Sequence, residues 1–190
     1  MFAKFGLRPI TMDDIAGELS ISKKTIYKYF SNKDELVQKA VEKVFNTNSG
    51  QIKDIAKRSG NAIDQLFNID DMVCGTVENY DHSLQFQLKR YHPEVFSWLE
   101  NQRKELITST TKANILKGQG EGLYRTNINV EIITLLYYSR MVVLTGHDID
   151  TFEKFDLKAV MREILIYHVR GLATQAGLSY LEEKLNKTQK

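Results

Sequence analysis

The stretch that decides the fold is TMDDIAGELSISKKTIYKYFSNKDELV, residues 11–37. Short polar side chains precede a helical pattern at three positions in it, Thr11, Ser22 and Asn32. Such side chains accept hydrogen bonds from the unpaired amides of a first helical turn. Glu35, three residues after Asn32, also fits the second half of a capping box. The pattern predicts short helices over residues 11–19 and 22–30 and a longer helix that begins near residue 33.

Only Ser20 and Ile21 are available for the turn between the first two helices, so we expect these helices to cross steeply. Apolar side chains recur one helical turn apart on each helix, and we expect them to close the corner. They are Ile15, Ala16, Leu19, Ile21, Ile26 and Phe30. Two short helices with a tight turn describe a helix-turn-helix, whose second helix enters the major groove of DNA.

The second helix carries cations on the face that points away from the expected core. Residues 20–33 contain four lysines and no acidic residue, and lysines that neutralise DNA phosphates release counterions. Threonine and tyrosine near a helix start can reach phosphates or base edges. From the residues alone, the lysines could equally form a solvated face, and Tyr27 could pack against the next helix. The candidate DNA-binding residues are Thr11, Ser22, Lys23, Lys24, Thr25, Tyr27, Lys28, Tyr29 and Lys33.

Residues 11–37 resemble the DNA-binding domain of the TetR family of bacterial transcriptional regulators. The resemblance rests on Thr11, Ile15, Ala16, Ser22, Thr25, Tyr27, Phe30, Lys33 and Leu36. It implies that Thr11 and Tyr27 contact phosphates, that residues 23–29 lie in the major groove, and that Lys33 holds the DNA backbone at the start of the long helix. Where the family often has a glycine in the turn, this chain has Ser20, which would be strained in a left-handed conformation. Lys24 replaces a residue that is usually small, and the helix before Gly6 looks shorter than the family's first helix.

The composition favours a packed, all-α protein. The chain has 190 residues, 42% of them apolar, with 26 lysines and arginines against 24 acidic residues, which argues against disorder. Residues 1–60 hold 11 of the basic and 7 of the acidic residues, so the positive excess lies near the helix-turn-helix. We expect a helix-turn-helix DNA-binding domain over residues 1–45 and a helical effector-binding and dimerisation domain over residues 46–190.

Helical spacing continues through the larger part of the chain. It predicts helices at 62–80, at 84–90, from Pro93 to the glycines at 118–122, at 130–145 and at 157–175. Apolar residues surround the 130–145 helix instead of forming one stripe, which is more than the core of a single subunit can cover. We therefore expect this helix and the 157–175 helix to form a four-helix homodimer interface, as the family resemblance also implies.

The resemblance further implies that the larger domain binds a small-molecule inducer among its middle helices. The candidates combine apolar walls with a few polar tips, as ligand cavities do, although aromatic residues at helical spacing also serve as ordinary core filling. The candidate effector-binding residues are Tyr80, His82, Phe86, Tyr91, Phe96, Trp98, Gln102, Tyr137, Tyr138 and Met141.

Several classes of protein are disfavoured. A lone cysteine, Cys74, and four scattered histidines form no disulfide framework, metal site or catalytic triad, so we expect no metal, no cofactor and no enzyme. The most apolar stretch, residues 132–144, contains Arg140 and is shorter than the roughly 20 residues of a membrane-spanning helix. With no export signal at the amino terminus, we expect a cytoplasmic protein.

The leading hypothesis is a dimeric transcriptional repressor that binds a double-stranded DNA operator and leaves it when a small molecule binds. The alternative is a DNA-bound helical dimer that recruits a protein partner without any small-molecule effector. An internal apolar cavity would favour the first, and an exposed groove without a cavity would favour the second.

Overall fold

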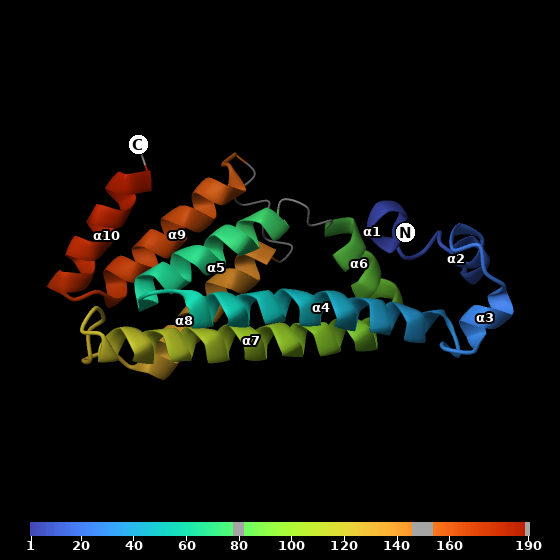
Figure 1. Cartoon of the computed structure of the whole chain (residues 1–190), viewed down its shortest axis with the longest axis horizontal. Coiled ribbons are helices and arrows are strands. Elements are labelled where there is room, and N and C mark those ends of the chain that lie inside the picture. Colours follow the sequence, from blue (N-terminus) through green and yellow to red (C-terminus); the bar gives the residue numbers. More distant parts are fainter. Residues whose placement is uncertain (78–81, 146–153, 189–190) are drawn as a thin grey trace. The chain divides into compact units, whose positions relative to one another are not determined.

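The computed structural model describes residues 1–77, 82–145 and 154–188, and every regular element in these ranges is a helix (Figure 1). The all-α prediction is therefore confirmed. In chain order the helices are α1 (Phe2–Phe5), α2 (Met12–Glu18), α3 (Lys23–Tyr27), α4 (Lys33–Arg58), α5 (Ala62–Val77), α6 (His82–Tyr91), α7 (Pro93–Gly120), α8 (Val130–Thr145), α9 (Leu157–Leu172) and α10 (Gln175–Thr188).

Most predicted helices appear with nearly the predicted bounds, including α2, α7 and α8. α3 is shorter than the predicted helix over 22–30. It ends at Tyr27, and the amides of Tyr29 and Phe30 both donate to the carbonyl of Ile26, at 2.9 and 3.1 Å. This shared acceptor marks a tightened final turn, so Lys28 and Tyr29 lie just beyond the helix.

The predicted helix over 157–175 corresponds to α9, which ends at Leu172; after a short break the structure adds α10 from Gln175, a helix that was not predicted. The break is made by the segment before α8. The amide of Thr174 donates to the carbonyl of Leu123 at 2.9 Å, and the amide of Arg125 donates to the carbonyl of Leu172 at 2.8 Å. The hydroxyl of Thr174 then accepts the amide of Gly177 at 3.2 Å, which caps α10.

The described residues form two compact units. The first contains Met1–Gly50 together with α6 and the beginning of α7, as far as Arg103. The second contains α5, α8, α9, α10, the chain from Gln51 to the end of α4, and α7 from Lys104.

Two apolar clusters stabilise the first unit. One joins α2 to α3 through Ile10, Met12, Ile15, Ala16 and Ile26, with Phe30 and Leu36 packed at its edge. The other contains Leu7, Val37, Leu88, Val95 and Leu99. The expectation that Leu19 and Ile21 also close the corner is wrong, because their side chains are 58% and 40% exposed. Leu19 is the C-cap of α2 and Ile21 lies in the turn, so neither residue lies on the buried face of a helix.

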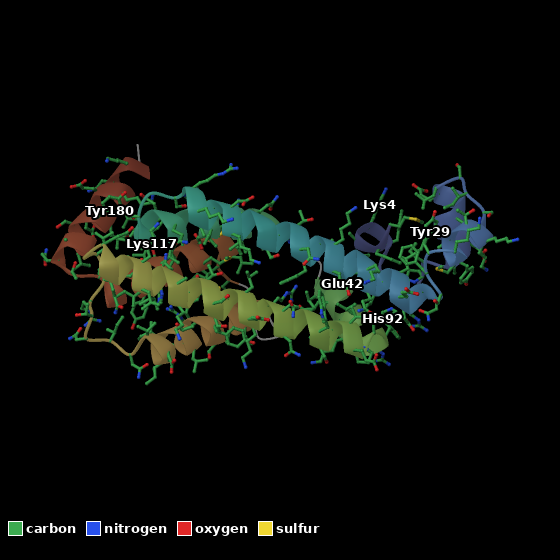
Figure 2. The ribbon with its side chains drawn as sticks, turned by 60° about the horizontal axis from the view of Figure 1, so that its bottom comes forward. Lys4, Tyr29, Glu42, His92, Lys117 and Tyr180 are labelled. Atoms are coloured by element: carbon green, nitrogen blue, oxygen red, sulfur yellow. The ribbon has the colours of Figure 1, made fainter. Side chains whose placement is uncertain are left out.

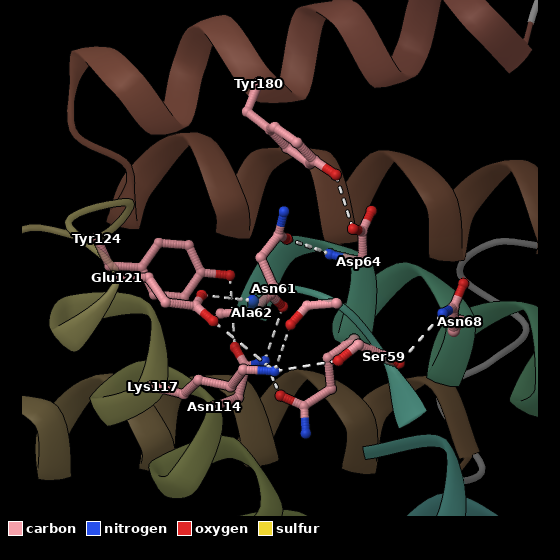
Figure 3. A network of polar contacts seen from close by, with 12 residues as sticks. Ser59, Asn61, Ala62, Asp64, Asn68, Asn114, Lys117, Glu121, Tyr124 and Tyr180 are labelled. Carbon is pink, nitrogen blue, oxygen red and sulfur yellow. Dashed lines mark hydrogen bonds and ion pairs between the residues drawn. The ribbon is translucent and has the colours of Figure 1, made fainter. Parts of the chain in front are cut away.

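The second unit has one large apolar core and a polar network beside it. The core combines α5, α7, α9 and α10 around Ile63, Ile115, Val169 and Leu181, all of them fully buried. α5 and α9 lie side by side in Figure 1. The polar network holds the start of α5: the buried amide of Asn114 donates to the carbonyl of Ala62 at 2.8 Å and to Gln65, and Glu121 accepts the amide of Ala62 (Figure 3).

α10 is joined to α5 at the same end of this unit. Asp64 accepts hydrogen bonds from the hydroxyl of Tyr180 and the ammonium of Lys184, both at 2.7 Å, and the first of these is drawn in Figure 3. The pKa of Asp64 is lowered because these bonds outweigh its partial burial. No helix in the described part of the chain is both long and apolar enough to cross a membrane.

Candidate nucleic-acid interface

The start of α2 is fixed by a reciprocal capping box. The hydroxyl of Thr11 accepts the amide of Asp14 at 3.2 Å, and the carboxylate of Asp14 accepts the amide of Thr11 at 2.8 Å and its hydroxyl at 2.6 Å. The hydrogen bonds from Thr11 lower the pKa of Asp14. The predicted contact of Thr11 with a phosphate stays a prediction, and the structure gives its side chain a role in capping.

The turn between α2 and α3 contains the left-handed residue that the sequence suggested. Ser20 has a φ of 53°, the one positive φ of a non-glycine residue in the described chain. The amide of Ile21 donates to the carbonyl of Ala16 at 3.0 Å and closes the end of α2. Ser22 then caps α3 by accepting the amide of Thr25 at 3.1 Å, while the hydroxyls of Ser22 and Thr25 lie 2.8 Å apart.

α3 has one buried face and one exposed face. Ile26 is buried in the core of the corner, whereas Lys24, Lys28 and Tyr29 are exposed. Tyr29, labelled in Figure 2, is 73% exposed, and Tyr27 is 45% exposed and therefore does not pack fully against the next helix. The arrangement presents cations and phenol groups to solvent from a rigid corner.

Two lysines differ from the others. The ammonium of Lys23 forms an exposed ion pair with Asp13 at 2.8 Å, and this hydrogen bond raises the pKa of Lys23. The ammonium of Lys33 is partly buried, which lowers its pKa, and it donates to the carbonyl of Leu7 at 2.5 Å. Lys33 therefore holds the segment before α2 in this structure. Its predicted contact with the DNA backbone stays a prediction.

The candidate effector residues are divided between the two units. Tyr80 and the side chain of His82 lie outside the described residues. Phe86, Tyr91, Phe96, Trp98 and Gln102 belong to the first unit, and Tyr137, Tyr138 and Met141 belong to the second. Phe96 and Trp98 pack against the core of the first unit, where the ring of Trp98 meets Phe45 edge to face at 5.8 Å. For these two residues, core filling is the role that their contacts support.

Each unit has an open cleft. In the first unit, a cleft of about 570 Å³ is lined by the first turn of α4 and the residues around Tyr91 and Trp98. In the second, a cleft of about 410 Å³ lies between α5 and α9, lined by Cys74, Lys158 and Arg162 among others. The described residues contain no group of three side chains suited to hold a metal ion.

The second unit contains a cluster of polar side chains, of which only Tyr137 is among the effector-binding residues predicted from the sequence. The rings of Tyr137 and His168 lie 4.6 Å apart, and the guanidinium of Arg140 lies 5.7 Å from the ring of Tyr137. Thr134 lies one helical turn before Tyr137 and is almost fully buried. Burial, reinforced by the charge of Arg140, lowers the pKa of His168 to about 3, and burial raises the pKa of Tyr137 to about 12.

Three atoms of this cluster are buried without a hydrogen-bond partner among the described residues: Thr134 Oγ1, Arg140 Nε and His168 Nε2. Buried polar atoms are usually paired with protein, water or ligand. The signal in the sequence was the recurrence of Thr134, Tyr137 and Arg140 at a spacing of three residues inside an apolar helix.

A capped, lysine-bearing helix that follows a tight turn and packs against the helix before it is the arrangement of the helix-turn-helix class of DNA-binding proteins. Comparisons with known proteins agree. Residues 1–40 match the family model "Bacterial regulatory proteins, tetR family". The resemblance to the DNA-binding domain of the TetR family is thus confirmed for the amino-terminal part of the chain.

Two curated relatives and one solved structure illustrate the match. The uncharacterized HTH-type transcriptional regulator YvaF of Bacillus subtilis (strain 168) is 30% identical over 96 residues, which span 50% of each chain. The chain therefore aligns with only half the length of that relative. The HTH-type transcriptional repressor KstR2 of Mycobacterium tuberculosis is 24% identical over 141 residues, 70% of this chain and 68% of KstR2.

The solved structure is that of the transcriptional regulator FadR from Bacillus subtilis in complex with stearoyl-CoA. It superposes with a TM-score of 0.68 at 17% identity and covers 90% of this chain and 92% of FadR. At this identity the likeness concerns the fold.

Proposed function

We propose that the protein is a homodimeric repressor that binds double-stranded operator DNA through α3 and is released by a small-molecule effector. The observation that carries the proposal is the pair of unlike faces of α3. Ile26 anchors the helix in the core, while Lys24 on α3, and Lys28 and Tyr29 directly after it, are exposed. The ion pair of Lys23 with exposed Asp13 is weak enough to be exchanged for a phosphate contact.

Homodimerisation is supported by an exposed apolar stripe on α8. Its members recur at helical spacing and are all at least 40% exposed: Ile132, Leu135, Leu136, Val142 and Val143. Tyr167, on the outer surface of neighbouring α9, is also exposed. A stripe of this size on a lone subunit is typical of an interaction surface. A second copy of the chain would bury it and would provide the second recognition helix that a twofold operator requires.

For the effector, the buried polar cluster of Thr134, Tyr137, Arg140 and His168 supports a ligand that has a polar, hydrogen-bonding group. Such a group would pair with the orphaned atoms of the cluster and relieve their desolvation, which costs about 1–3 kcal/mol for each buried polar atom. Stearoyl-CoA and ketosteroids, which the names of solved relatives mention, are suitable first compounds for a binding screen.

Selection of bound sequences from genomic fragments tests the proposal. The wild-type chain is expected to enrich a site with two related half-sites. A double variant, Lys24→Glu with Lys28→Glu, is expected to lose this enrichment, and Lys112→Glu, which changes an exposed lysine of the second unit, is the matched control. No enrichment by the wild type, or equal enrichment by the charge-reversed variant, would contradict DNA binding through α3.

The same material tests the dimer. Sedimentation of the purified chain is expected to give a dimer. A monomer that gains mass only with another protein would instead support the alternative, in which the apolar stripe on α8 recruits a different partner.

A further inference from the structure

The segment between α1 and α2 is held by a residue that lies about 80 positions further along the chain. The side-chain oxygen of Gln87, on α6, accepts the amide of Leu7 at 2.8 Å and the amide of Arg8 at 3.1 Å. Both amides belong to a non-helical segment. These two amides have no carbonyl acceptor from a helical turn, and the side-chain oxygen of Gln87 takes that place.

Gly6 permits this close approach. It has a φ of 83°, a conformation that side chains disfavour, and a Cβ at this position would lie 2.9 Å from the amide group of Gln87. The next residue, Leu7, is 3% exposed and packs with Val37 of α4 and Leu88 of α6. The backbone at residues 6–8 is thus fitted to α6 by shape as well as by hydrogen bonds.

Two further contacts join the segments before and after the helix-turn-helix to the end of α6. The guanidinium of Arg8 lies 5.5 Å from the ring of Tyr91, which supports the entry to α2. On the exit side, Nδ1 of the buried His92 lies 2.7 Å from the carboxylate of Asp34, in the first turn of α4. His92 is labelled in Figure 2. The end of α6 and the residue that follows it therefore contact the chain both before and after the helix-turn-helix.

We infer that Gln87 is a positioning residue for DNA binding, because its side-chain oxygen fixes the amides of Leu7 and Arg8 and with them the orientation of α2 and α3 relative to α6 within the first unit. The inference rests on the proposed function. It adds that the affinity for a complete operator depends on a side chain that itself touches no DNA.

The physical reason is the conformational entropy that a mobile helix-turn-helix loses when it binds DNA, which lowers the affinity. Two recognition helices of a dimer reach successive major grooves only when their centres are roughly 34–36 Å apart. If residues 6–8 lose their acceptor, each helix-turn-helix gains freedom that binding must remove, and the affinity falls by that amount. A single half-site imposes no spacing, so binding to it is expected to depend much less on Gln87.

Three variants of α6 test the inference on the DNA recovered by genomic selection and on one half of that DNA. Gln87→Leu keeps the size but removes the acceptor, and it is expected to weaken binding to the full site about tenfold, while binding to the half-site changes less than about twofold. Gln87→Glu restores an acceptor that can take both amides, and it is expected to bind the full site like the wild type. Gln85→Leu, the same change two residues away, is the matched control.

Amide hydrogen exchange supplies an independent measurement. The amides of Leu7 and Arg8 are expected to lose protection in Gln87→Leu and to keep it in Gln87→Glu and Gln85→Leu. If Gln87→Leu does not fold, Gln87→Asn, whose acceptor is withdrawn by one methylene, carries the same expectations.

The outcomes separate this inference from the proposed function. A wild-type chain that binds no DNA overturns the proposed function, and the inference with it. A wild-type chain that binds, together with a Gln87→Leu variant that binds the full site equally well or loses full-site and half-site binding to the same extent, overturns only the positioning role.

Discussion

At the scale of single residues, Ser20 marks the place where the turn between α2 and α3 is under strain. A left-handed conformation costs most L-residues about 1–2 kcal/mol, and glycine adopts it freely. Ser20 has a φ of 53° and an exposed side chain, so its strain is not offset by burial.

We predict that Ser20→Gly raises the free energy of unfolding by about 0.5–1 kcal/mol, the relief of strain less the entropy that glycine adds to the unfolded chain. Thermal or urea unfolding measures the change. Ser31→Gly is the control, because Ser31 has no positive φ and gains nothing from glycine. Equal effects of the two substitutions would show that the turn is not strained.

His168 predicts a dependence of stability on pH. Its pKa is about 3 in the folded chain and 6.5 in the unfolded chain, so between these values the unfolded state binds more protons. The contribution of His168 is complete above pH 6.5 and is lost as the pH falls toward 3. Asp70 works in the opposite direction, because burial raises its pKa to about 6 and its contribution is lost as the pH rises through that value.

We predict that His168→Gln, which removes the titrating group, loses less stability on acidification than the wild type, by up to about 3 kcal/mol at pH 4. Urea unfolding of both proteins at pH 7 and pH 4 measures the difference, and Asp70 cancels because both proteins contain it. Parallel loss of stability in the two proteins would mean that His168 is not buried in its neutral form.

At the scale of elements, Lys28 at the end of α3 and Lys33 at the start of α4 are expected to differ, because only Lys33 also has a hydrogen bond within the described part of the protein. Lys28→Ala is expected to weaken operator and random DNA alike and to make the salt dependence of log K shallower by about one unit, with unchanged stability. Lys33→Ala removes the bond to the carbonyl of Leu7 and is expected also to lower the free energy of unfolding by about 1 kcal/mol.

Binding at several salt concentrations and urea unfolding measure both effects, with Lys112→Ala of the second unit as the control. If Lys28→Ala leaves the salt dependence unchanged, its ammonium does not contact phosphate. If Lys33→Ala unfolds at the same urea concentration as the wild type, its bond to Leu7 contributes nothing to stability.

The sequence predicted elements wherever the local signal was strong. Caps at Thr11 and Ser22 and the unusual residue at Ser20 were sufficient to find the helix-turn-helix. α10 was not predicted, although Gly171 and Gly177 flank the break between it and α9. The break itself is made by backbone hydrogen bonds with Leu123 and Arg125, which lie some 50 residues earlier.

The candidate site was predictable to a similar degree. The exposed face of α3 followed from the expected burial of Ile26 and Phe30, because buried positions one turn apart fix which face of a helix points to the core. The hydrogen bond of Lys33 to Leu7 and those of Gln87 with the amides of Leu7 and Arg8 depend on tertiary contacts that no local pattern encodes. For the same reason the polar partners around Arg140 were missed, since His168 lies on a different helix.

At the scale of the whole molecule, the proposed function requires two copies of the chain. Leu135 and Leu136 lie in the middle of the exposed stripe on α8, and each is more than half exposed. Charges at these positions would have to be buried unpaired in a dimer interface, which is strongly unfavourable.

We predict that the double substitution Leu135→Glu with Leu136→Glu gives a helical monomer that binds a half-site but loses affinity for the full operator. Analytical ultracentrifugation and circular dichroism measure the two properties. Val44→Glu, a charge at an equally exposed apolar position of α4, is the control and is expected to leave the dimer intact. A doubly substituted chain that remains dimeric would exclude this stripe as the interface.

The central claim, that a pair of α3 helices reads two grooves of one DNA duplex, is tested most directly by hydroxyl-radical footprinting on the selected operator. The account predicts two protected segments on one face of the duplex, with centres roughly 34–36 Å apart, that disappear with Lys24→Glu and Lys28→Glu. Protection that survives this charge reversal, or that lacks the paired spacing, would contradict it.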